Sequence, residues 1–273
     1  MSPWLEASES LVMAAGGTLL GAWFSRLQKP YWLLGYFIPF AVIMGYSLVT
    51  RIPQLVFVPP FSWMLMGRSK LVVLGFVITM VLTTPLLKLP RRRDRLGVSL
   101  IMVLITLTMS VWPCLAPAFC RGELARLATT VDEDGICRQG TDYTCGPASA
   151  VTALRRLGFS ANEGELAILA GTAPSTGTPP DILAVALENR YGPEGLVAEY
   201  RAFKSIDELR GCGLVLAVVK FNLLMDHYVT VLDVNDREVT VGDPLTGVRR
   251  YSHPAFAEEW RFVGVVLGRR AAK

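Results

Sequence analysis

Apolar residues fill most of the first 120 positions of this chain, in long runs that short polar segments separate. Five such runs can be marked, at residues 11–24, 31–50, 54–67, 71–87 and 97–119. A helix needs about 20 apolar residues to cross a membrane, with a usual range of about 17–25. The second, fourth and fifth runs reach this length, the first is shorter, and the third carries Pro59-Pro60 and also fits a re-entrant or interfacial segment. The pattern therefore predicts a bundle of four or five transmembrane helices over residues 1–120.

The pattern of apolar positions changes after residue 120. A polar and acidic stretch at residues 121–136 is typical of a linker, and residues 137–273 are long enough for one domain with a core of its own. Helical periodicity and end signals predict helices at residues 145–157, 162–170, 180–190, 205–210 and 254–260. Apolar runs of strand type lie at residues 214–221, 228–234, 238–241 and 262–267. Helices followed by an antiparallel sheet indicate an α+β fold.

Charge separates the two parts of the chain. Residues 1–120 hold 10 Lys and Arg against 3 Asp and Glu, and residues 121–273 hold 17 against 20, so the net charges are +7 and −3. The slightly acidic second part argues against a nucleic-acid partner. The densest basic cluster, at residues 88–95, is expected on the cytoplasmic side, because Lys and Arg accumulate in cytoplasmic loops. The next span then carries residues 121–273 to the opposite, extracytoplasmic side.

The membrane part is expected to act as an anchor. Its long spans contain no ionisable residue, whereas such residues mark the path of a transported ion or proton. A cleavable signal peptide would begin with a basic segment, which the first apolar run lacks. The chain also lacks the Gly-x-x-x-x-Gly-Lys-Ser/Thr run that binds nucleotide phosphates. The adjacent Gly16 and Gly17 are expected to pack against another helix rather than to mark a site of self-processing.

One cysteine lies where a loop is predicted to become a helix. Cys145 is followed by Gly146 and Pro147, and proline fits the first turn of a helix because it has no N–H to leave unpaired. The unpaired N–H groups of a helix N-terminus stabilise a thiolate, the reactive form of a cysteine. The sequence alone leaves open a second reading, in which Cys145 is a buried and inert residue. The other four cysteines have no comparable context, although Cys120 and Cys137 flank the linker and could form a disulfide outside the cell.

Only two histidines are available as a general base for this cysteine. His227 begins a predicted strand, and the turn Asn235-Asp236-Arg237 predicts a hairpin whose paired residue numbers sum to about 470. This register places His227 opposite Asp243, a carboxylate that could orient the imidazole. His253, next to Pro254, lacks such an acid. Gln139, six residues before Cys145, is a candidate donor to an oxyanion. Two histidines and scattered cysteines give no zinc-ligand spacing, so neither a metal nor another cofactor is expected.

These residues resemble the bacteriocin-processing peptidases that cut double-glycine leaders, and their stand-alone relatives in the papain-like clan. The resemblance covers residues 136–268 and rests on Gln139, Asp142-Tyr143-Thr144-Cys145-Gly146-Pro147-Ala148-Ser149, Gly177-Thr178, His227-Tyr228-Val229-Thr230-Val231, Gly242-Asp243-Pro244-Leu245-Thr246-Gly247, Phe256 and Trp260. It implies a papain-like domain with Cys145 as nucleophile, His227 as base, Asp243 as its orienting acid and Gln139 in the oxyanion hole. It also implies a bacterial cytoplasmic membrane as the location, and it leaves open a secretion or export system as a partner.

The sequence therefore predicts a membrane-anchored cysteine peptidase that acts on a peptide or protein without a cofactor. Three domain ranges follow: a transmembrane anchor at 1–120, a linker at 121–136 and the peptidase domain at 137–273. Two other functions stay open at this point. The same residues could serve a thiol-dependent acyl transferase, an amidase or a cell-wall endopeptidase, or the fold could be a catalytically silent module that binds peptides.

Overall fold

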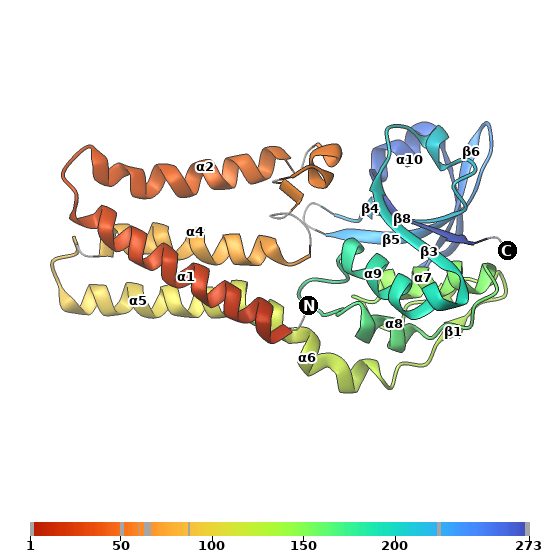
Figure 1. Ribbon diagram of the computed structural model, residues 1–273, viewed down its shortest axis with the longest axis horizontal. Helices are drawn as coiled ribbons and strands as arrows, with labels where there is room; N and C mark the ends of the chain where they lie inside the picture. The colour runs from red at the N-terminus through yellow and green to blue at the C-terminus, as the bar shows by residue number, and fades with distance from the viewer. Residues whose placement is uncertain are drawn as a thin grey trace. The chain divides into compact units, whose positions relative to one another are not determined.

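The computed structural model describes residues 3–49, 52–59, 61–62, 67–86, 88–222 and 225–270. The chain divides into two compact units, Met1–Ala118 and Phe119–Lys273. The first unit is helical, and the second consists of helices followed by strands, as the ribbon in Figure 1 shows. Each unit has a cluster of buried apolar side chains of its own.

The first unit is built from long helices. They are α1 (Pro3–Arg26), α2 (Leu34–Val49), α4 (Ser69–Leu86) and α5 (Arg92–Thr106), and a π-helical turn at Leu107–Val111 joins α5 to α6 (Trp112–Leu124). Within the described part of the chain, three segments are long and apolar enough to cross a membrane: Tyr31–Val49, Ser69–Leu86 and Arg92–Leu124. They correspond to the second, fourth and fifth apolar runs. The first run forms most of α1, and the third run overlaps a short 3₁₀ helix, Pro53–Phe57, next to residues outside the described part.

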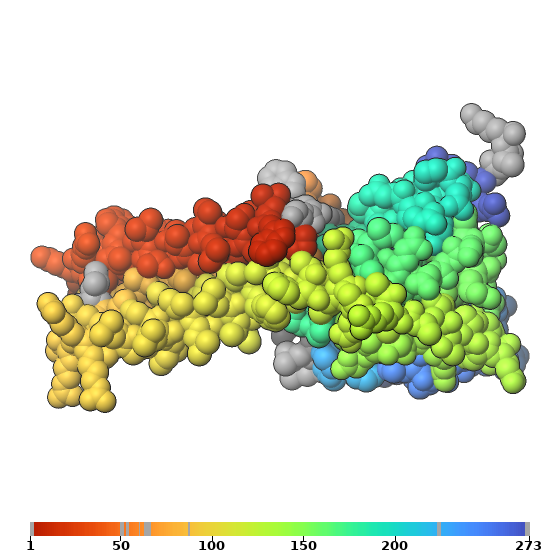
Figure 2. All heavy atoms as spheres, turned by 90° about the horizontal axis from the view of Figure 1, so that it is seen from below, coloured from red at the N-terminus to blue at the C-terminus, as the bar shows by residue number. Residues whose placement is uncertain are grey.

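Polar side chains lie buried between the helices of this unit. The Arg68 guanidinium donates to Glu6 in α1 over 2.9 Å, with side chains only 4% and 7% exposed. Ser10 of α1 and Ser110 of the π-helical turn share a hydrogen bond, so these two segments lie side by side, as the red and yellow atoms of Figure 2 show. Hydrogen bonds between polar groups hold helices together where the surroundings are apolar. Helix α1 thus places an ionisable residue, Glu6, in a buried ion pair within this unit.

Small residues let the helices approach one another closely. A Cβ atom on Gly17 would collide with the backbone oxygen of Phe76 and the hydroxyl of Thr79 in α4, whereas a Cβ on Gly16 would meet nothing within 4 Å. Close approach over small residues is typical of helix packing in membranes. Gly17 therefore packs in the bundle, as the sequence indicated for the Gly16-Gly17 pair.

The second unit contains the predicted helices and a six-stranded sheet. Its helices are α7 (Cys145–Arg156), α8 (Glu163–Leu169), α9 (Pro180–Tyr191) and α10 (His253–Glu259). Its strands are β1 (Thr130–Val131), β2 (Cys137–Arg138), β3 (Leu196–Ala202), β4 (Leu214–Lys220), β5 (Asp226–Val234), β6 (Glu238–Asp243), β7 (Gly247–Ser252) and β8 (Trp260–Arg269). The predicted helix at 205–210 is a 3₁₀ turn, Ile206–Leu209.

All neighbours in the large sheet are antiparallel, in the order β3-β8-β4-β5-β6-β7. Alternating valines of β4, β5 and β6 point from one face into a core that also contains Phe203, Phe256 of α10 and Trp260. Helix α7 packs on the other face, against β4 and β5 (Figure 1). The sheet therefore separates an aromatic core from the helix that begins at Cys145.

The structure differs from the sequence prediction at three segments. Strands β3 and β7 were not predicted, because the polar residues within them (Glu199 and Arg201 in β3, Arg249 and Arg250 in β7) interrupt the apolar pattern. Residues 121–136 were expected to be a linker, but they include the end of α6 and strand β1, which pairs with β2 just after this segment. Ile136 is fully buried and lies against Gly242, so this segment belongs to the core of the second unit.

The two adjacent glycines of α1 offer a matched pair of variants. Gly17→Ala is expected to destabilise the helical unit by about 1–3 kcal/mol, because overpacking a tight contact has a cost of this size. Gly16→Ala makes the same change in helix propensity, which favours alanine by about 1 kcal/mol, without a clash. Thermal unfolding of both full-length variants in detergent would measure the difference. Equal midpoints for the two variants would show that the contact of Gly17 with α4 is absent in solution.

Candidate active site

The first residue of α7 is Cys145. Its side chain is buried, with 8% exposed, and Thr144 precedes it at the helix N-cap position with no side-chain capping bond. The N–H groups of the first turn of a helix have no partner within that helix. The sulfur therefore lies beside unpaired donors, as the sequence predicted from Gly146 and Pro147.

Helix α7 is fastened to β5 by a reciprocal pair of hydrogen bonds. The Ser149 hydroxyl donates to the carbonyl of Tyr228 over 3.1 Å, and the Thr230 hydroxyl donates to the carbonyl of Ser149 over 2.9 Å. All of these groups are buried. Ser149 lies one helical turn after Cys145, and Tyr228 follows His227 directly. The two bonds therefore fix the distance between the candidate nucleophile and the candidate base.

His227 and Asp243 form a buried pair. The Nε2 atom of His227 lies 2.8 Å from Oδ1 of Asp243, with side chains 8% and 6% exposed. Two further groups donate to the carboxylate, the backbone N–H of Leu245 over 2.9 Å and the Thr246 hydroxyl over 2.7 Å. Since Asp243 occupies Nε2, the other ring nitrogen of His227 is left for the Cys145 thiol, which also hydrogen-bonds to this imidazole.

The strand register that brings the pair together is not the predicted one. Thr230 pairs with Gly242 and Val231 with Val241, so residue numbers sum to 472 rather than to about 470. If this register continues to the end of the strand, Asp243 lies opposite the residue two positions after His227, on the same face of the sheet. Such a diagonal neighbour is within reach of long side chains. The hairpin turn lies further along the chain than predicted. A bulge between Val231 and Asp233 shifts the pairing by one residue, and this shift keeps His227 and Asp243 on the same face of the sheet.

The pKa values of the pair are displaced in opposite directions. Burial disfavours the charged form of His227, but the hydrogen bonds with Asp243 and Cys145 outweigh it and raise the pKa of His227 to about 9. Burial alone would raise the pKa of Asp243, yet the hydrogen bonds from His227, Leu245 and Thr246 lower it to about 2. At neutral pH the pair is therefore an imidazolium bonded to a carboxylate.

Gln139 lies beside this pair. Its backbone N–H donates to the carbonyl of Pro244, the residue after Asp243, over 3.2 Å. Its side-chain Nε2 donates to the carbonyl of Thr141 over 2.6 Å, while its buried Oε1 has no partner among the described residues. An amide nitrogen carries two hydrogens, so one N–H of Gln139 remains for another acceptor.

The other candidate residues lie elsewhere. His253 begins α10 and its Nε2 is 2.9 Å from the carbonyl of Asn235, in the hairpin turn. Cys120 and Cys137 form no disulfide, since all five cysteines of the chain are free thiols. Burial, followed by the charge of Glu163, raises the pKa of the Cys137 thiol to about 12, so this thiol is unreactive.

Several residues of the site were not singled out from the sequence. Thr246 and Leu245 belong to the motif quoted above, and an Asp followed three residues later by Thr could have suggested that the turn bonds back to its carboxylate. The ring of Phe221 lies 5.7 Å from the ring of His227. Ser149 also belongs to the quoted motif but was given no role, because a serine inside a helix has many ordinary explanations.

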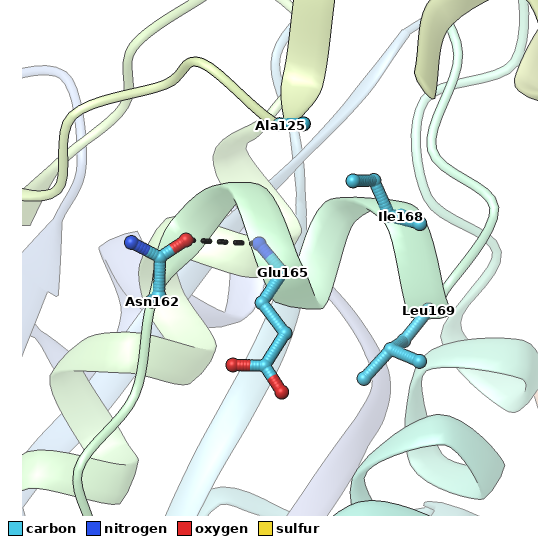
Figure 3. A pocket seen from close by; sticks show the side chains of 5 residues that line it. All are labelled: Ala125, Asn162, Glu165, Ile168 and Leu169. Carbon is cyan, nitrogen blue, oxygen red and sulfur yellow. Dashed lines mark hydrogen bonds between the residues drawn. The ribbon is translucent and has the colours of Figure 1, made fainter. Parts of the chain in front are cut away.

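A surface depression lies on another part of the second unit. Ala125, Asn162, Glu165, Ile168 and Leu169 line it, and Figure 3 shows the Asn162 side chain accepting from the backbone N–H of Glu165. None of the candidate catalytic residues lines this depression. Within the described ranges, no group of three or more His, Cys, Asp or Glu side chains is arranged to hold a metal ion.

The model of the peptidase C39 family matches residues 134–272, which is half of the chain and contains Gln139, Cys145, His227 and Asp243. The chain belongs to the peptidase C39 family. It is therefore a cysteine peptidase, and the order of helices followed by an antiparallel sheet fits the papain-like domain of this family.

Similar proteins come from archaea and bacteria. An uncharacterised protein of Methanothermobacter marburgensis is 34% identical over 145 residues, 53% of this chain and 94% of that protein. One of Methanothermobacter thermautotrophicus is 32% identical over 125 residues, 46% of this chain and 82% of that protein. Among solved structures, the peptidase domain of Streptococcus ComA, a bifunctional ABC transporter, has 20% identity and a TM-score of 0.44, over 49% of this chain and 96% of that domain. The C39 assignment rests on the family match.

The pH dependence of stability follows from the two displaced pKa values. The raised pKa of His227 contributes stability that is complete below about pH 6.5 and is lost progressively as the pH rises to about 9. The lowered pKa of Asp243 contributes stability that is complete above about pH 4 and is lost as the pH falls towards 2. Asp243→Asn keeps the shape but removes the charge, so it is expected to lower the Tm most at pH 4–6.5 and less at pH 9.

Thermal unfolding of the full chain between pH 5 and 9 would measure this difference. For a domain of 150–250 residues, each kcal/mol lost lowers the Tm by about 2–4 °C. Asp236→Asn is the matched control, because Asp236 pairs with Arg210 over the same 2.8 Å but is 90% exposed. An exposed pair contributes about 0–1 kcal/mol. A Tm difference for Asp243→Asn that is the same at pH 6 and pH 9 would contradict the displaced pKa of His227.

Proposed function

We propose that this C39 peptidase is a membrane-anchored enzyme that cuts peptide bonds with Cys145 as nucleophile, His227 as general base and Asp243 as the acid that orients the imidazole. The observation that carries the proposal is the continuous line of hydrogen bonds from the Asp243 carboxylate through the His227 ring to the Cys145 thiol. A nucleophile, a base and an orienting acid within hydrogen-bonding reach define this type of site.

The protonation of His227 supports the role of the thiolate. A pKa of about 9 means that the imidazole holds a proton at neutral pH, and a cation next to a cysteine favours the thiolate. The thiolate, rather than the thiol, is the nucleophilic form of cysteine. The N-terminal turn of α7 adds unpaired N–H groups beside the same sulfur.

The oxyanion would be bound by two N–H groups. One belongs to the backbone of Cys145, and the other is the free side-chain N–H of Gln139, whose amide is held by Thr141. Donors that are already fixed before reaction stabilise the developing charge without reorganising. The backbone bond from Gln139 to Pro244 keeps this residue next to the His227–Asp243 pair.

The reaction then follows from these positions. The Cys145 sulfur attacks the carbonyl carbon of the substrate, and the carbonyl electrons form the oxyanion. The oxyanion collapses, the C–N bond breaks, and His227 gives its proton to the leaving amine, which leaves a thioester on Cys145. Water, deprotonated by His227, attacks the thioester and releases the carboxylic acid and the free enzyme.

A peptide is the substrate class that fits the surroundings of the site. Phe221, 57% exposed, lies against the His227 ring, and Leu245, 44% exposed, donates its N–H to Asp243. These two apolar side chains flank the catalytic pair, and apolar side chains at a site bind apolar groups of a ligand. We therefore expect a preference for apolar residues near the scissile bond.

Among the described residues, the proposed anchor contains α1, α2, α4, α5 and the start of α6, and its basic residues gather at one end. Lys88, after α4, lies 4.3 Å over the ring of Trp32, at the start of the next helix after α1. Seven basic residues lie in these two connections or in the helix ends beside them, namely Arg26, Lys29, Lys88, Arg91, Arg92, Arg93 and Arg95. Within the described residues, the other end has Arg68 and Lys70, and Arg68 is neutralised by Glu6. The bias towards the first end supports a cytoplasmic location for it, with the peptidase domain following on the other side.

Loss of the Cys145 thiol is expected to abolish cleavage. The full chain in detergent would be screened against a fluorogenic peptide library, and Cys145→Ala should show no turnover of any peptide that the natural chain cuts. His227→Ala should slow iodoacetamide alkylation of Cys145 at pH 6–7, because the base that holds the thiol proton is gone. Turnover by Cys145→Ala would refute the mechanism, and a new amide rather than a carboxylic acid as product would show acyl transfer instead of hydrolysis.

The proposed orientation can be tested in cells. An epitope tag after residue 270 is expected to be digested by a protease added to intact spheroplasts, whereas a tag inserted at residues 89–90 should be protected until the membrane is opened. The two tags serve as controls for each other within one chain. Protection of the first tag together with digestion of the second would reverse the topology.

A further inference from the structure

A buried acid outside the catalytic residues lies beneath the loop that leads to Cys145. Glu163, in the first turn of α8, is 0% exposed. Acidic side chains are almost never fully buried without a partner, because removing the charge from water is costly. Burial accordingly raises the pKa of Glu163, although the hydrogen bond from Gly140 opposes the rise. The proposed mechanism does not use this carboxyl group.

The carboxyl group is bonded directly to the loop. Its Oε1 atom accepts from the backbone N–H of Gly140 over 2.8 Å, and Gly140 follows Gln139 in the chain. A Cβ atom on Gly140 would lie 3.0 Å from Leu127 and 3.5 Å from Oε2 of Glu163, so Gly140 lies directly against the acid. Glu163 is itself held, because its backbone N–H donates to the Thr129 hydroxyl over 2.9 Å.

The loop is therefore anchored on two sides. On the sheet side, the backbone N–H of Gln139 bonds to Pro244. On the helix side, Gly140 bonds to Glu163, one residue further along. Because the backbone N–H groups of Gln139 and Gly140 are both hydrogen-bonded, the backbone that carries the Gln139 side chain is held in place. Catalytic donors must be held to within about 0.5 Å by such supporting bonds.

We propose that Glu163 is a positioning residue for the oxyanion hole, holding Gly140 so that the Gln139 amide stays directed at the substrate carbonyl next to Cys145. The proposal rests on the roles given above to Gln139 and Cys145. What matters is the acceptor oxygen of Glu163 rather than its charge, because its bond to the loop is made to a neutral N–H. Glutamine should therefore replace it, and leucine, of similar size but without an acceptor, should not.

Two reactions of the same thiol separate positioning from general damage. Acylation of Cys145 by p-nitrophenyl acetate passes through a tetrahedral oxyanion: the sulfur bonds to the carbonyl carbon and p-nitrophenolate then leaves. Alkylation by iodoacetamide forms a C–S bond as iodide leaves, with no oxyanion. Both rates would be measured on the full chain in detergent, after subtracting the rates of Cys145→Ala, for Glu163→Gln, Glu163→Leu and the control Glu165→Ala. Glu165 is on the same helix but is exposed and paired with Arg190.

Glu163→Leu is expected to slow acylation at least about tenfold, below the loss of about 10²–10³ found when an oxyanion donor is removed outright. Its alkylation rate should stay within about twofold of the natural chain, and Glu163→Gln and Glu165→Ala should retain both rates. Equal losses of acylation and alkylation in Glu163→Leu would overturn the proposal, because they would indicate a damaged fold. Unchanged acylation, or a Glu163→Gln variant as slow as Glu163→Leu, would overturn it as well.

The variants Gln139→Ala and Cys145→Ala test the proposed roles of Gln139 and Cys145 separately from that of Glu163. Gln139→Ala should slow acylation and spare alkylation, as Glu163→Leu does, and the double variant should be no slower than Gln139→Ala alone. If Gln139→Ala leaves acylation unchanged while Glu163→Leu slows it, Gln139 is not an oxyanion donor and Glu163 does not act through Gln139. If Cys145→Ala retains the full acylation rate, the proposed nucleophile fails independently of Glu163.

Discussion

The hydrogen bonds between α7 and β5 are the constraint on which the site depends. The candidate nucleophile begins a helix and the candidate base begins a strand, so their distance is set by how these two elements pack. Ser149 and Thr230 exchange hydrogen bonds with the facing backbone within a few residues of Cys145 and His227. An error of about 1 Å in such a distance can cost a factor of about 10² in rate. Directional bonds hold that distance more strictly than apolar contacts, which tolerate sliding.

The second requirement is electrostatic, and the β6–β7 turn meets it. Asp243 is lined by the N–H of Leu245, the hydroxyl of Thr246 and the His227 ring, which stabilise its charge although it is buried. A carboxylate that is charged at neutral pH keeps the imidazole protonated and holds one ring nitrogen. The residues of one short turn thereby decide both the charge of the base and which nitrogen faces Cys145.

The sequence predicted the helices, four of the six strands of the large sheet and the four candidate residues because their signals are local. The start of α7 follows from Gly146 and Pro147 in one turn. The strand register depends instead on where the hairpin turn closes and on a bulge after Val231, and neither has a local signature, so the predicted sum of paired numbers was wrong by two. Glu163 was not singled out from the sequence, because its contact with Gly140 joins positions 23 residues apart.

The cost of burying polar groups near residues 139–145 indicates where function constrains the fold. The Glu163 carboxyl group is fully buried, and the Oε1 atom of Gln139 has no partner among the described residues. An unsatisfied buried polar atom costs about 1–3 kcal/mol, and apolar residues of similar shape would avoid that cost. Stability alone therefore does not account for these two side chains. Glu163 and Gln139 both hold the loop before Cys145. If this loop must present an amide N–H to the oxyanion, that function explains why the two polar side chains are kept despite their cost.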